Sequence, residues 1–324
     1  MFTSFFCLYK SQSMTYHDIC QRLTPLYGPQ EAKAMTRLLL EDLFSLSFAD
    51  ILCGATEHLS DADSLRLQQS VDRLLDAEPL QYVTGTAFFC GHPFHVAPGV
   101  LIPRPETEWI VDTAVGLVTA SAPRILDIGT GSGCIATSIS LALADRHCHT
   151  EAWDISEDAL RIAADNAARL GADVKFRRRD ALRLEEDIPA EEKLEEDLPA
   201  EEKLEAEQGG AEVLSDTNAA AESWDIIVSN PPYICNREAA DMHANVLRHE
   251  PHLALFVPDT DPLLFYRAIA RYAMRSLRKG GWLLFECNTL YAHVTEQMTL
   301  DMGFATSVVE DDCFGKPRFV KAQK

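Results

Sequence analysis

The sequence Asn-Pro-Pro-Tyr at residues 230–233 combines residue types that could hold a planar amino group. Asn230 offers a side-chain carbonyl oxygen, and two consecutive prolines lack backbone N–H donors, which leaves carbonyl groups free to accept. Tyr233 adds an aromatic face. Two acceptors that bind the hydrogens of an –NH2 group turn its nitrogen lone pair toward an electrophile. We therefore predict a site that orients a weakly nucleophilic amide or aryl amine, rather than a proline-rich turn without function.

A second candidate is the glycine-rich loop Asp-Ile-Gly-Thr-Gly-Ser-Gly at residues 127–133. Its glycines can turn tightly and bring the backbone close to a ligand. Asp154, which ends the next predicted strand, is spaced to accept hydrogen bonds from ribose hydroxyls. The loop also fits the dinucleotide pattern G-x-G-x-x-A, so a nicotinamide cofactor is one interpretation. Asp127 would repel a pyrophosphate and suits the ammonium group of S-adenosylmethionine, which is the other.

From residue 123 onward, the sequence pattern alternates between strands and helices that carry these residues. Predicted strands cover 124–128, 150–154, 174–177, 224–230, 282–287, 305–311 and 317–322, and predicted helices cover 134–144, 157–170, 262–278 and 290–302. Gly280 and Gly281 are expected to end the third of these helices. Repeated β–α units predict an α/β fold with a doubly wound, mostly parallel, seven-stranded Rossmann-like sheet. Ligands of such sheets bind at the carboxyl ends of the strands.

The rest of the chain predicts three further segments. Residues 15–78 show helical spacing of apolar residues, which predicts a small helical bundle. Residues 79–108 are rich in Pro, Gly and aromatic residues and predict a hairpin connector. Residues 1–14 are expected to be a disordered extension, with Met1 and Met14 both possible first residues.

An acidic insert interrupts the alternating pattern after the third strand. The decapeptide EEDIPAEEKL at 185–194 returns as EEDLPAEEKL at 195–204. Low apolar content and high charge predict that residues 185–222 form a disordered loop, with a functional acidic arm as the alternative.

Composition indicates a globular protein of a reducing compartment. Of the 324 residues, 47% are hydrophobic and 24% charged, and the nine cysteines form no CxxC pair. No apolar run reaches the length of about 18 residues that a membrane-spanning helix needs. The net charge of −21 disfavours tight binding to phosphate backbones. We expect a cytoplasmic monomer without direct contacts to nucleic acid or membrane, and we expect no metal because the histidines lack ligand spacing.

Taken together, the motifs resemble a known family. The loop at 127–133, Asp154, Asp180 and the NPPY segment at 230–233 resemble, in this order, the S-adenosylmethionine-dependent amino-methyltransferases. Three more segments narrow the resemblance to the peptide chain release factor glutamine N5-methyltransferases (HemK-type): EPLQYVTG at 78–85, LIPRPETE at 101–108 and RHEP at 248–251. Apart from the insert, the resemblance runs from about residue 15 to residue 321.

The resemblance implies methyl transfer from S-adenosylmethionine to the side-chain amide nitrogen (N5) of the glutamine in the Gly-Gly-Gln motif of class 1 release factors. Residues 15–78 would dock this protein substrate, and 109–324 would form the methyltransferase domain. The implied catalytic residues are Asn230, Pro231 and Tyr233, and the substrate-binding residues are these three with Pro232 and Arg104. The implied cofactor-binding residues are Asp127, Gly129, Thr130, Gly131, Ser132, Gly133, Asp154, Asp180, Ala181 and Asn230. The family often carries an aromatic residue where Ala181 stands, so adenine stacking by that side chain is in doubt.

Several alternatives stay open at the level of sequence. Arg104 and Glu106 either shape a substrate channel or form a surface ion pair. Glu286 ends a predicted buried strand near the expected cleft, where it either orients the methyl-donor region or has no functional role. An adenine-N6 nucleic-acid methyltransferase could use the same NPPY motif, although such enzymes usually carry a basic target-reading surface. A non-catalytic adaptor that binds a translation factor is the third possibility.

Overall fold

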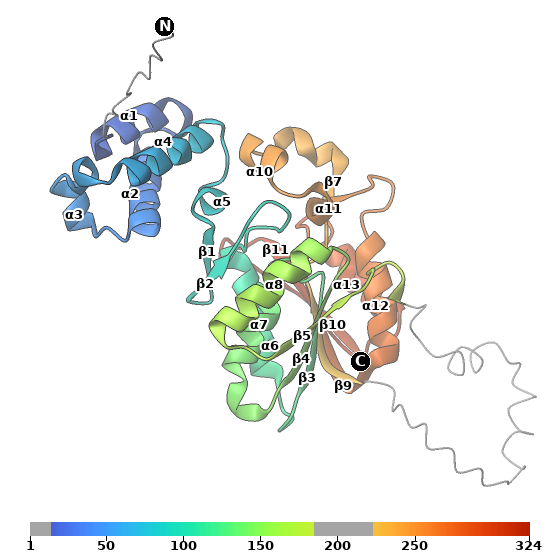
Figure 1. Ribbon diagram of the computed structural model, residues 1–324. Helices are drawn as coiled ribbons and strands as arrows, with labels where there is room; N and C mark the ends of the chain where they lie inside the picture. Colours follow the sequence, from blue (N-terminus) through green and yellow to red (C-terminus); the bar gives the residue numbers. More distant parts are fainter. Residues whose placement is uncertain (1–13, 185–222) are drawn as a thin grey trace, which may run out of the picture. The chain divides into compact units, whose positions relative to one another are not determined.

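The computed structural model describes residues 14–184 and 223–324 and divides the chain into two compact units (Figure 1). The predictions for the N-terminal extension, up to residue 13, and for the acidic insert over 185–222 lie outside the described residues. The helical unit comprises the chain up to Phe88 together with Pro93–Ile102 and Ala240–Pro251. The sheet unit comprises Phe89–His92, Pro103–Ala239 and His252–Lys324.

The helical unit is built from short amphipathic helices. These are α1 (Tyr16–Tyr27), α2 (Pro29–Phe44), α3 (Phe48–Leu52), a 3-10 turn at Ala55–His58, α4 (Asp61–Leu75) and α5 (Leu80–Thr84). Thr15, Ser47 and Ser60 cap three of them with side-chain oxygens that accept a backbone N–H from the first turn. The buried faces meet in one core that includes Leu23, Leu39 and Val83.

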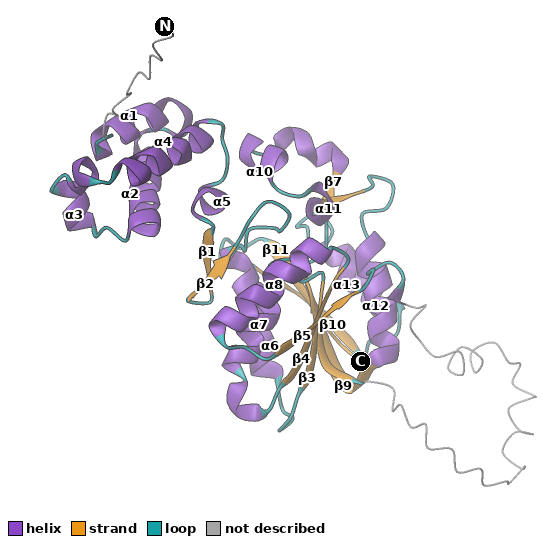
Figure 2. Cartoon of the chain, in the orientation of Figure 1, coloured by secondary structure: helices purple, strands orange, loops and turns teal. Residues whose placement is uncertain are grey.

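The segment after these helices contains a two-stranded hairpin, β1 (Thr86–Phe89) with β2 (His92–His95), visible in Figure 2. A later segment also belongs to the helical unit. It contains α10 (Ala244–His249), and the Nε2 atom of His249 lies 3.3 Å from the carbonyl oxygen of Asp76. The helical unit is therefore assembled from parts of the chain that are far apart in sequence.

The sheet unit contains the predicted seven-stranded sheet. Its strands are β3 (Arg124–Ile128), β4 (His149–Asp154), β5 (Val174–Arg178), β6 (Trp224–Ser229), β9 (Leu277–Glu286), β10 (Thr306–Asp311) and β11 (Pro317–Gln323). Their order is β10-β11-β9-β6-β3-β4-β5, and of these seven strands only β11 runs antiparallel to the others. This confirms the α/β fold class and the mostly parallel sheet.

Helices cover both faces of this sheet. Helices α6 (Glu108–Leu117), α7 (Cys134–Ala142) and α8 (Glu157–Leu170) lie on one face, and α12 (Leu264–Ser276) and α13 (Ala292–Asp301) on the other (Figure 1). A 3-10 turn at Ala144–Arg146 follows α7. Strand β6 is buried along its whole length and β3 at every residue except the half-buried Arg124, as expected for parallel strands with helices on both sides. No helix within the described ranges 14–184 and 223–324 is long and apolar enough to cross a membrane.

The prediction that Gly280 and Gly281 separate a helix from a strand is wrong. Helix α12 ends at Ser276, and β9 begins at Leu277, so both glycines lie inside the strand. At Gly281 a Cβ atom would stand 3.0 Å from the carbonyl oxygen of Asp225 on the neighbouring strand β6. The pairing of β6 with β9 is irregular at this place, so the glycine is required by close approach of two backbones.

Beyond β6 the chain forms short elements that the sequence pattern did not predict. They are β7 (Ile234–Cys235), a 3-10 turn (Asn236–Asp241), α11 (His252–Leu255) and β8 (Phe256–Val257). Strands β7 and β8 pair in parallel, so the two ends of the segment between Cys235 and Phe256 are held together directly after the NPPY segment.

Candidate active site

The glycine-rich loop leaves the carboxyl end of β3 and leads into α7. The backbone N–H groups of Gly129 and Thr130 both donate to the carbonyl oxygen of Trp153, at 2.8 and 3.0 Å, which fastens the loop to β4. Gly129, Gly131 and Gly133 all have positive φ angles. At Gly133 a Cβ atom would lie 2.8 Å from the Cβ of Ala163, whereas at Gly129 and Gly131 it would meet nothing within 4 Å. The first two glycines therefore border open space, and the third borders α8.

Asp127 lies at the base of this loop and is fully buried. Burial raises the pKa of its carboxyl group to about 7, against the effect of a hydrogen bond from the Thr130 hydroxyl at 2.6 Å. A buried carboxyl group at this place disfavours a pyrophosphate and favours a cationic ligand. Ser132 is buried as well, and its carbonyl oxygen accepts a hydrogen bond of 3.0 Å from the Nδ2 atom of Asn166.

Asp154 stands at the carboxyl end of β4, next to the glycine loop. Its Oδ2 atom accepts the N–H of Gly131 at 2.9 Å, and its Oδ1 atom accepts the N–H of Ser156 at 2.9 Å. Burial raises the pKa of Asp154, and these backbone hydrogen bonds act in the opposite direction. Each carboxylate oxygen can still accept a further hydrogen bond, as binding of a ribose diol requires.

Asp180 and Ala181 follow the end of β5. The Oδ1 atom of Asp180 accepts the N–H of Leu182 at 2.9 Å, and Ala181 packs against the core of the sheet unit. The N–H of Arg179 donates to the carbonyl oxygen of Asp154 at 3.0 Å, so the ends of β4 and β5 are joined. The residues predicted for the methionine, ribose and adenine parts of the cofactor thus follow three adjacent strands, β3, β4 and β5.

The site suits S-adenosylmethionine on the chemistry of its own residues. The N-terminus of α7 presents backbone N–H groups and a partial positive charge, which favour a carboxylate. Asp127 beneath the loop favours an ammonium group, and the open space at Gly129 and Gly131 leaves room for the ligand. An amino-acid group carries both charges, whereas a dinucleotide carries neither an ammonium nor a free α-carboxylate.

The NPPY segment begins directly after β6, which pairs with β3. The Ser229 hydroxyl donates to the carbonyl oxygen of Ile128 at 2.6 Å, so Asn230 starts level with the glycine loop. Pro231 is buried, and Pro232 and Tyr233 are half-buried. The N–H of Tyr233 donates to the carbonyl oxygen of Leu255 at 3.2 Å, which holds the segment from its far end.

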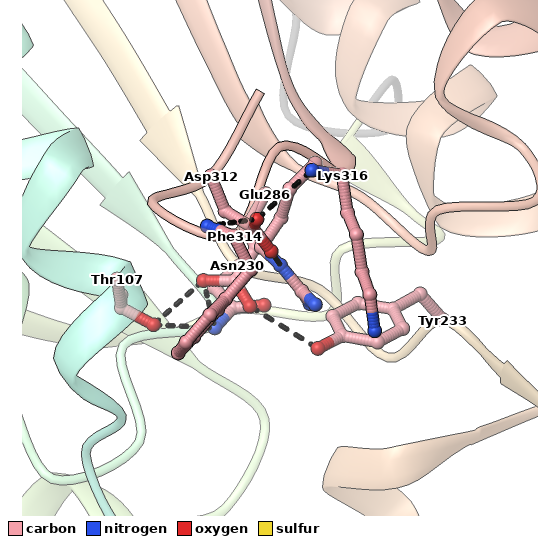
Figure 3. A network of polar contacts seen from close by, with 8 residues as sticks. Thr107, Asn230, Tyr233, Glu286, Asp312, Phe314 and Lys316 are labelled. Carbon is pink, nitrogen blue, oxygen red and sulfur yellow. Dashed lines mark hydrogen bonds and ion pairs between the residues drawn. The ribbon is translucent and has the colours of Figure 1, made fainter. Parts of the chain in front are cut away.

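Three side chains converge on Glu286, the last residue of β9 (Figure 3). The Nδ2 atom of Asn230 lies 3.1 Å from Oε2, and the Tyr233 hydroxyl lies 3.1 Å from Oε1. Thr107, in the 3-10 turn Pro105–Thr107, donates its hydroxyl to Oε2 at 2.6 Å. Glu286 is 1% exposed, and burial raises its pKa, while the hydroxyls of Thr107 and Tyr233 and the charge of Arg318 lower it.

Further contacts fix the walls of this site. The Nδ2 atom of Asn288 donates to the carbonyl oxygen of Tyr233 at 3.2 Å and to the carboxylate of Glu238. Arg318 on β11 forms an ion pair of 2.8 Å with Asp312, whose carboxylate also accepts the N–H groups of Phe314 and Lys316 (Figure 3). The N–H of Cys287, directly after β9, donates to the carbonyl oxygen of Arg318 at 2.6 Å, which holds this hairpin at the carboxyl end of β9.

The structure brings the predicted residues of the sheet unit to one edge of the sheet. Arg104 is half-buried and near enough to Tyr233 that its charge lowers the pKa of the phenol, although burial raises that pKa more strongly. Sequence analysis gave Thr107 no role, and for Glu286 it considered only the orientation of the methyl-donor region, not a contact with Asn230. The available signal for Glu286 was an acidic residue at the end of the apolar strand sequence Trp-Leu-Leu-Phe.

Comparisons with known proteins address both halves of the chain. Residues 16–85 match a family model described as the PrmC N-terminal domain, and residues 120–195 match a methyltransferase domain. The chain is 42% identical over 306 residues to the release factor glutamine methyltransferase of Bacteroides thetaiotaomicron, covering 94% of this chain and 98% of that protein. It is 34% identical to the release factor glutamine methyltransferase of Flavobacterium psychrophilum, covering 93% of this chain and 95% of that protein.

Among solved structures, the chain is similar to a methyltransferase from Pyrococcus furiosus. The TM-score is 0.44 at 13% identity, and the match covers 82% of this chain and 99% of the other. The sequence relatives span nearly the full length of the chain, both units included, and the family follows from them.

Proposed function

Because this chain belongs to the release factor glutamine methyltransferases, we propose that it methylates the side-chain amide nitrogen (N5) of the glutamine in the Gly-Gly-Gln motif of class 1 peptide chain release factors. The observation that carries this proposal is the 42% identity to a relative of that name across 98% of the relative's length. The two relatives described above are named for a protein substrate, and this favours release factors over nucleic-acid bases.

S-adenosylmethionine supplies an electrophilic methyl group on a sulfonium centre. Gly129 to Gly133 surround its methionine part, with Asp127 facing the ammonium group. Asp154 accepts hydrogen bonds from the ribose, and Asp180 with Ala181 borders the adenine. These roles are supported by the order of the residues along three neighbouring strand ends and by the acidic, open loop.

The remaining residues orient the amide that is to be methylated. The Oδ1 atom of Asn230 and the carbonyl oxygen of Pro231 accept the two N–H groups of the substrate amide, and Pro232 and Tyr233 border its plane. An amide nitrogen is a poor nucleophile because its lone pair is delocalised, so fixed orientation is the main contribution that this site makes. Methyl transfer would break the S–CH3 bond and release the neutral thioether. The nitrogen, more acidic once it carries the methyl group, would give its proton to solvent, so no strong base has to act beforehand. Arg104 lines the substrate side.

The wider setting is part of the same proposal. We place the reaction in the cytoplasm, with a monomeric enzyme that makes no direct contact with nucleic acid. The cysteines of the described residues are free thiols, which suits a reducing compartment, and the net charge of −21 opposes binding to phosphate backbones.

The experiment is incubation of the protein with S-adenosylmethionine and a bacterial class 1 release factor. Mass spectrometry of the Gly-Gly-Gln peptide should show the added mass of one methylene group. A peptide that stays unmodified beside an intact, cofactor-binding protein would contradict the proposal, and methylation of DNA or RNA would point to the nucleic-acid alternative.

Replacing the amide acceptor gives a sharper test. Asn230→Ala should lower kcat by about 100- to 10,000-fold, because the substrate nitrogen loses one of its two orienting acceptors. Asn236→Ala is the matched control, since the exposed Asn236 side chain donates only at 3.3 Å to the carbonyl oxygen of Val257. Steady-state kinetics should show the loss in the first variant alone. Retained turnover in Asn230→Ala would remove Asn230 from the mechanism, and loss of turnover without a loss of release factor binding would exclude the adaptor function.

A further inference from the structure

Glu286 is a buried carboxyl group that faces three hydrogen-bond donors and lies behind the amide acceptor. It is 1% exposed, and its partners are the hydroxyls of Thr107 and Tyr233 and the Nδ2 atom of Asn230, at 2.6, 3.1 and 3.1 Å (Figure 3). A buried carboxyl group with three donors is a strong constraint on each of them, because a lost partner is not replaced by water.

The constraint on Asn230 is directional. An asparagine side chain has one end that donates and one end that accepts, and the two ends have nearly the same shape. An ionised carboxylate can only accept, so it holds the –NH2 end of Asn230 toward itself. The Thr107 hydroxyl, 3.4 Å from Nδ2, reinforces this because its own hydrogen is directed to Oε2 of Glu286. The Oδ1 atom is then the end that remains for a substrate.

This orientation of Asn230 allows the site to distinguish a glutamine side chain from a glutamate side chain, which has nearly the same shape. A glutamine amide can donate two N–H groups to acceptors, whereas a glutamate carboxylate can donate none at neutral pH. The carboxylate oxygens of a glutamate in the same place would face the two acceptors of the site, Oδ1 of Asn230 and the carbonyl oxygen of Pro231, and no hydrogen bond could form. It would also bring a second negative charge close to Glu286, whose charge Arg318 balances in part.

We propose that Glu286 is a positioning residue that fixes Asn230 with its oxygen toward the substrate, and that it thereby makes the site select a glutamine amide over a glutamate carboxylate. This inference rests on the proposed function. Glu286 itself touches neither substrate nor cofactor in this scheme, and it transfers no proton. Its effect on the reaction passes through Asn230 and Tyr233.

The test is Glu286→Gln, which keeps the shape and removes the charge. A glutamine here can accept from Asn230 or donate to it, so both orientations of the Asn230 amide become possible. Two ligands are compared in the full-length enzyme with S-adenosylmethionine: a class 1 release factor, and the same protein with glutamate in place of the Gly-Gly-Gln glutamine, added as a competitor. The wild-type enzyme should prefer the glutamine protein by ~1,000-fold or more.

In Glu286→Gln we expect kcat to fall about 10- to 100-fold and the preference for glutamine over glutamate to fall at least about tenfold, with the KM for S-adenosylmethionine within about twofold of wild type. The ratio of the two affinities is the decisive readout. If Glu286 contributed only to stability, the variant would bind both release factor proteins more weakly by the same factor, and the ratio of the two affinities would not change. This result would overturn the inference. Wild-type kcat and ratio in the variant would overturn it as well.

Two further variants complete the design. Thr107→Val removes the hydroxyl that donates to the same oxygen as Asn230, and should lower the ratio of the two affinities by a smaller factor than Glu286→Gln does. In the double variant Thr107→Val should add little to the effect of Glu286→Gln, because both substitutions act through the contact between Glu286 and Asn230. This variant keeps the inference testable if Glu286→Gln does not fold. Glu151→Gln is the control for loss of a buried charge, since Glu151 on β4 pairs with Arg177 on β5 at 2.6 Å. The ratio of the two affinities in this variant should equal that of the wild-type enzyme. A wild-type enzyme that leaves the glutamine unmodified would instead overturn the proposed function, and the inference with it.

Discussion

Asp127 carries a carboxyl group without access to water at the place where the proposed cofactor brings positive charge. Burial raises its pKa to about 7, whereas in the unfolded chain it ionises near pH 4. Between these values the folded protein binds more protons than the unfolded chain. The contribution of Asp127 to stability is therefore present in acid and is lost as the pH rises through about 7. A bound ammonium group would offset part of this loss.

Asp127→Asn should consequently stabilise the cofactor-free enzyme and weaken its binding of S-adenosylmethionine. We expect the gain in the free energy of unfolding to grow between pH 5 and pH 8 and to reach about 2–4 kcal/mol. The Kd for S-adenosylmethionine should rise about 10- to 100-fold, because the ammonium group loses its charged partner. Urea unfolding at both pH values and calorimetric titration measure the two effects. A stability gain that is independent of pH, or an unchanged Kd, would contradict this role of Asp127.

For single residues, the sequence was sufficient to predict their location in the fold, while their roles stay predictions. Asn230, Asp127 and Asp154 were selected by their residue types and by their positions at the carboxyl ends of predicted strands, because parallel strands place such residues at one edge of the sheet. The contact between Glu286 and Asn230 was not predicted. It depends on which strand lies next to β6, and the order β9-β6-β3 is a property of the whole sheet. The register that sets Phe285 opposite Ser229, and so Glu286 beside Asn230, is equally absent from the local pattern.

At the level of elements, the glycine loop joins two functions that substitutions can separate. Gly133, with φ 78°, begins α7 against α8, where an added Cβ would lie 2.8 Å from the Cβ of Ala163. Gly131, with φ 55°, borders open space. The first position is required by packing between helices, and the second leaves room for a ligand.

We predict different outcomes for alanine at these two positions. Gly133→Ala should lower the free energy of unfolding by about 2–4 kcal/mol, from the strained backbone together with the overlap with α8. Gly131→Ala should lower it by only about 1–2 kcal/mol, from the backbone alone, but should raise the Kd for S-adenosylmethionine at least about tenfold. Chemical unfolding and calorimetry on both variants give the comparison. If both variants lost the same stability and Gly131→Ala bound the cofactor as the wild type does, the loop glycines would be required only for their backbone conformation and not for cofactor binding.

Strand β9 shows why the boundaries of elements were harder to predict than their existence. The sequence Gly280-Gly281 is a strong local signal for a break, and the helix before it does end nearby, at Ser276. The strand nevertheless begins at Leu277, and Gly281 within it lies close to the backbone of Asp225 on β6. A contact between two strands that are distant in sequence thus overrides a local signal. The short strands β7 and β8 have the same origin, since each consists of two residues and depends on the other.

For the whole molecule, the two compact units do not correspond to two continuous stretches of sequence. The helical unit takes in Pro93–Ile102 and Ala240–Pro251, which flank parts of the sheet unit along the chain. Its core also continues beyond residue 78, where the sequence pattern suggested that the helices end. Val83 on α5 is 6% exposed within that core, and the match to the PrmC N-terminal domain extends to residue 85.

This organisation predicts which N-terminal fragment folds. Arg73 near the end of α4 forms an ion pair with Glu78 and donates to the carbonyl oxygen of Tyr82 at 3.0 Å, so α5 is joined to the bundle by polar contacts as well as by Val83. A fragment of residues 14–85 should therefore be more stable than a fragment of residues 14–78 by about 3 kcal/mol, from the burial of Val83 and Leu80 and the retained hydrogen bonds. Thermal and urea unfolding monitored by circular dichroism measure the difference. Val83→Ala in the longer fragment is the internal control and should remove about half of it, since only the apolar part is lost. Equal stability of the two fragments would show that the bundle is complete without α5.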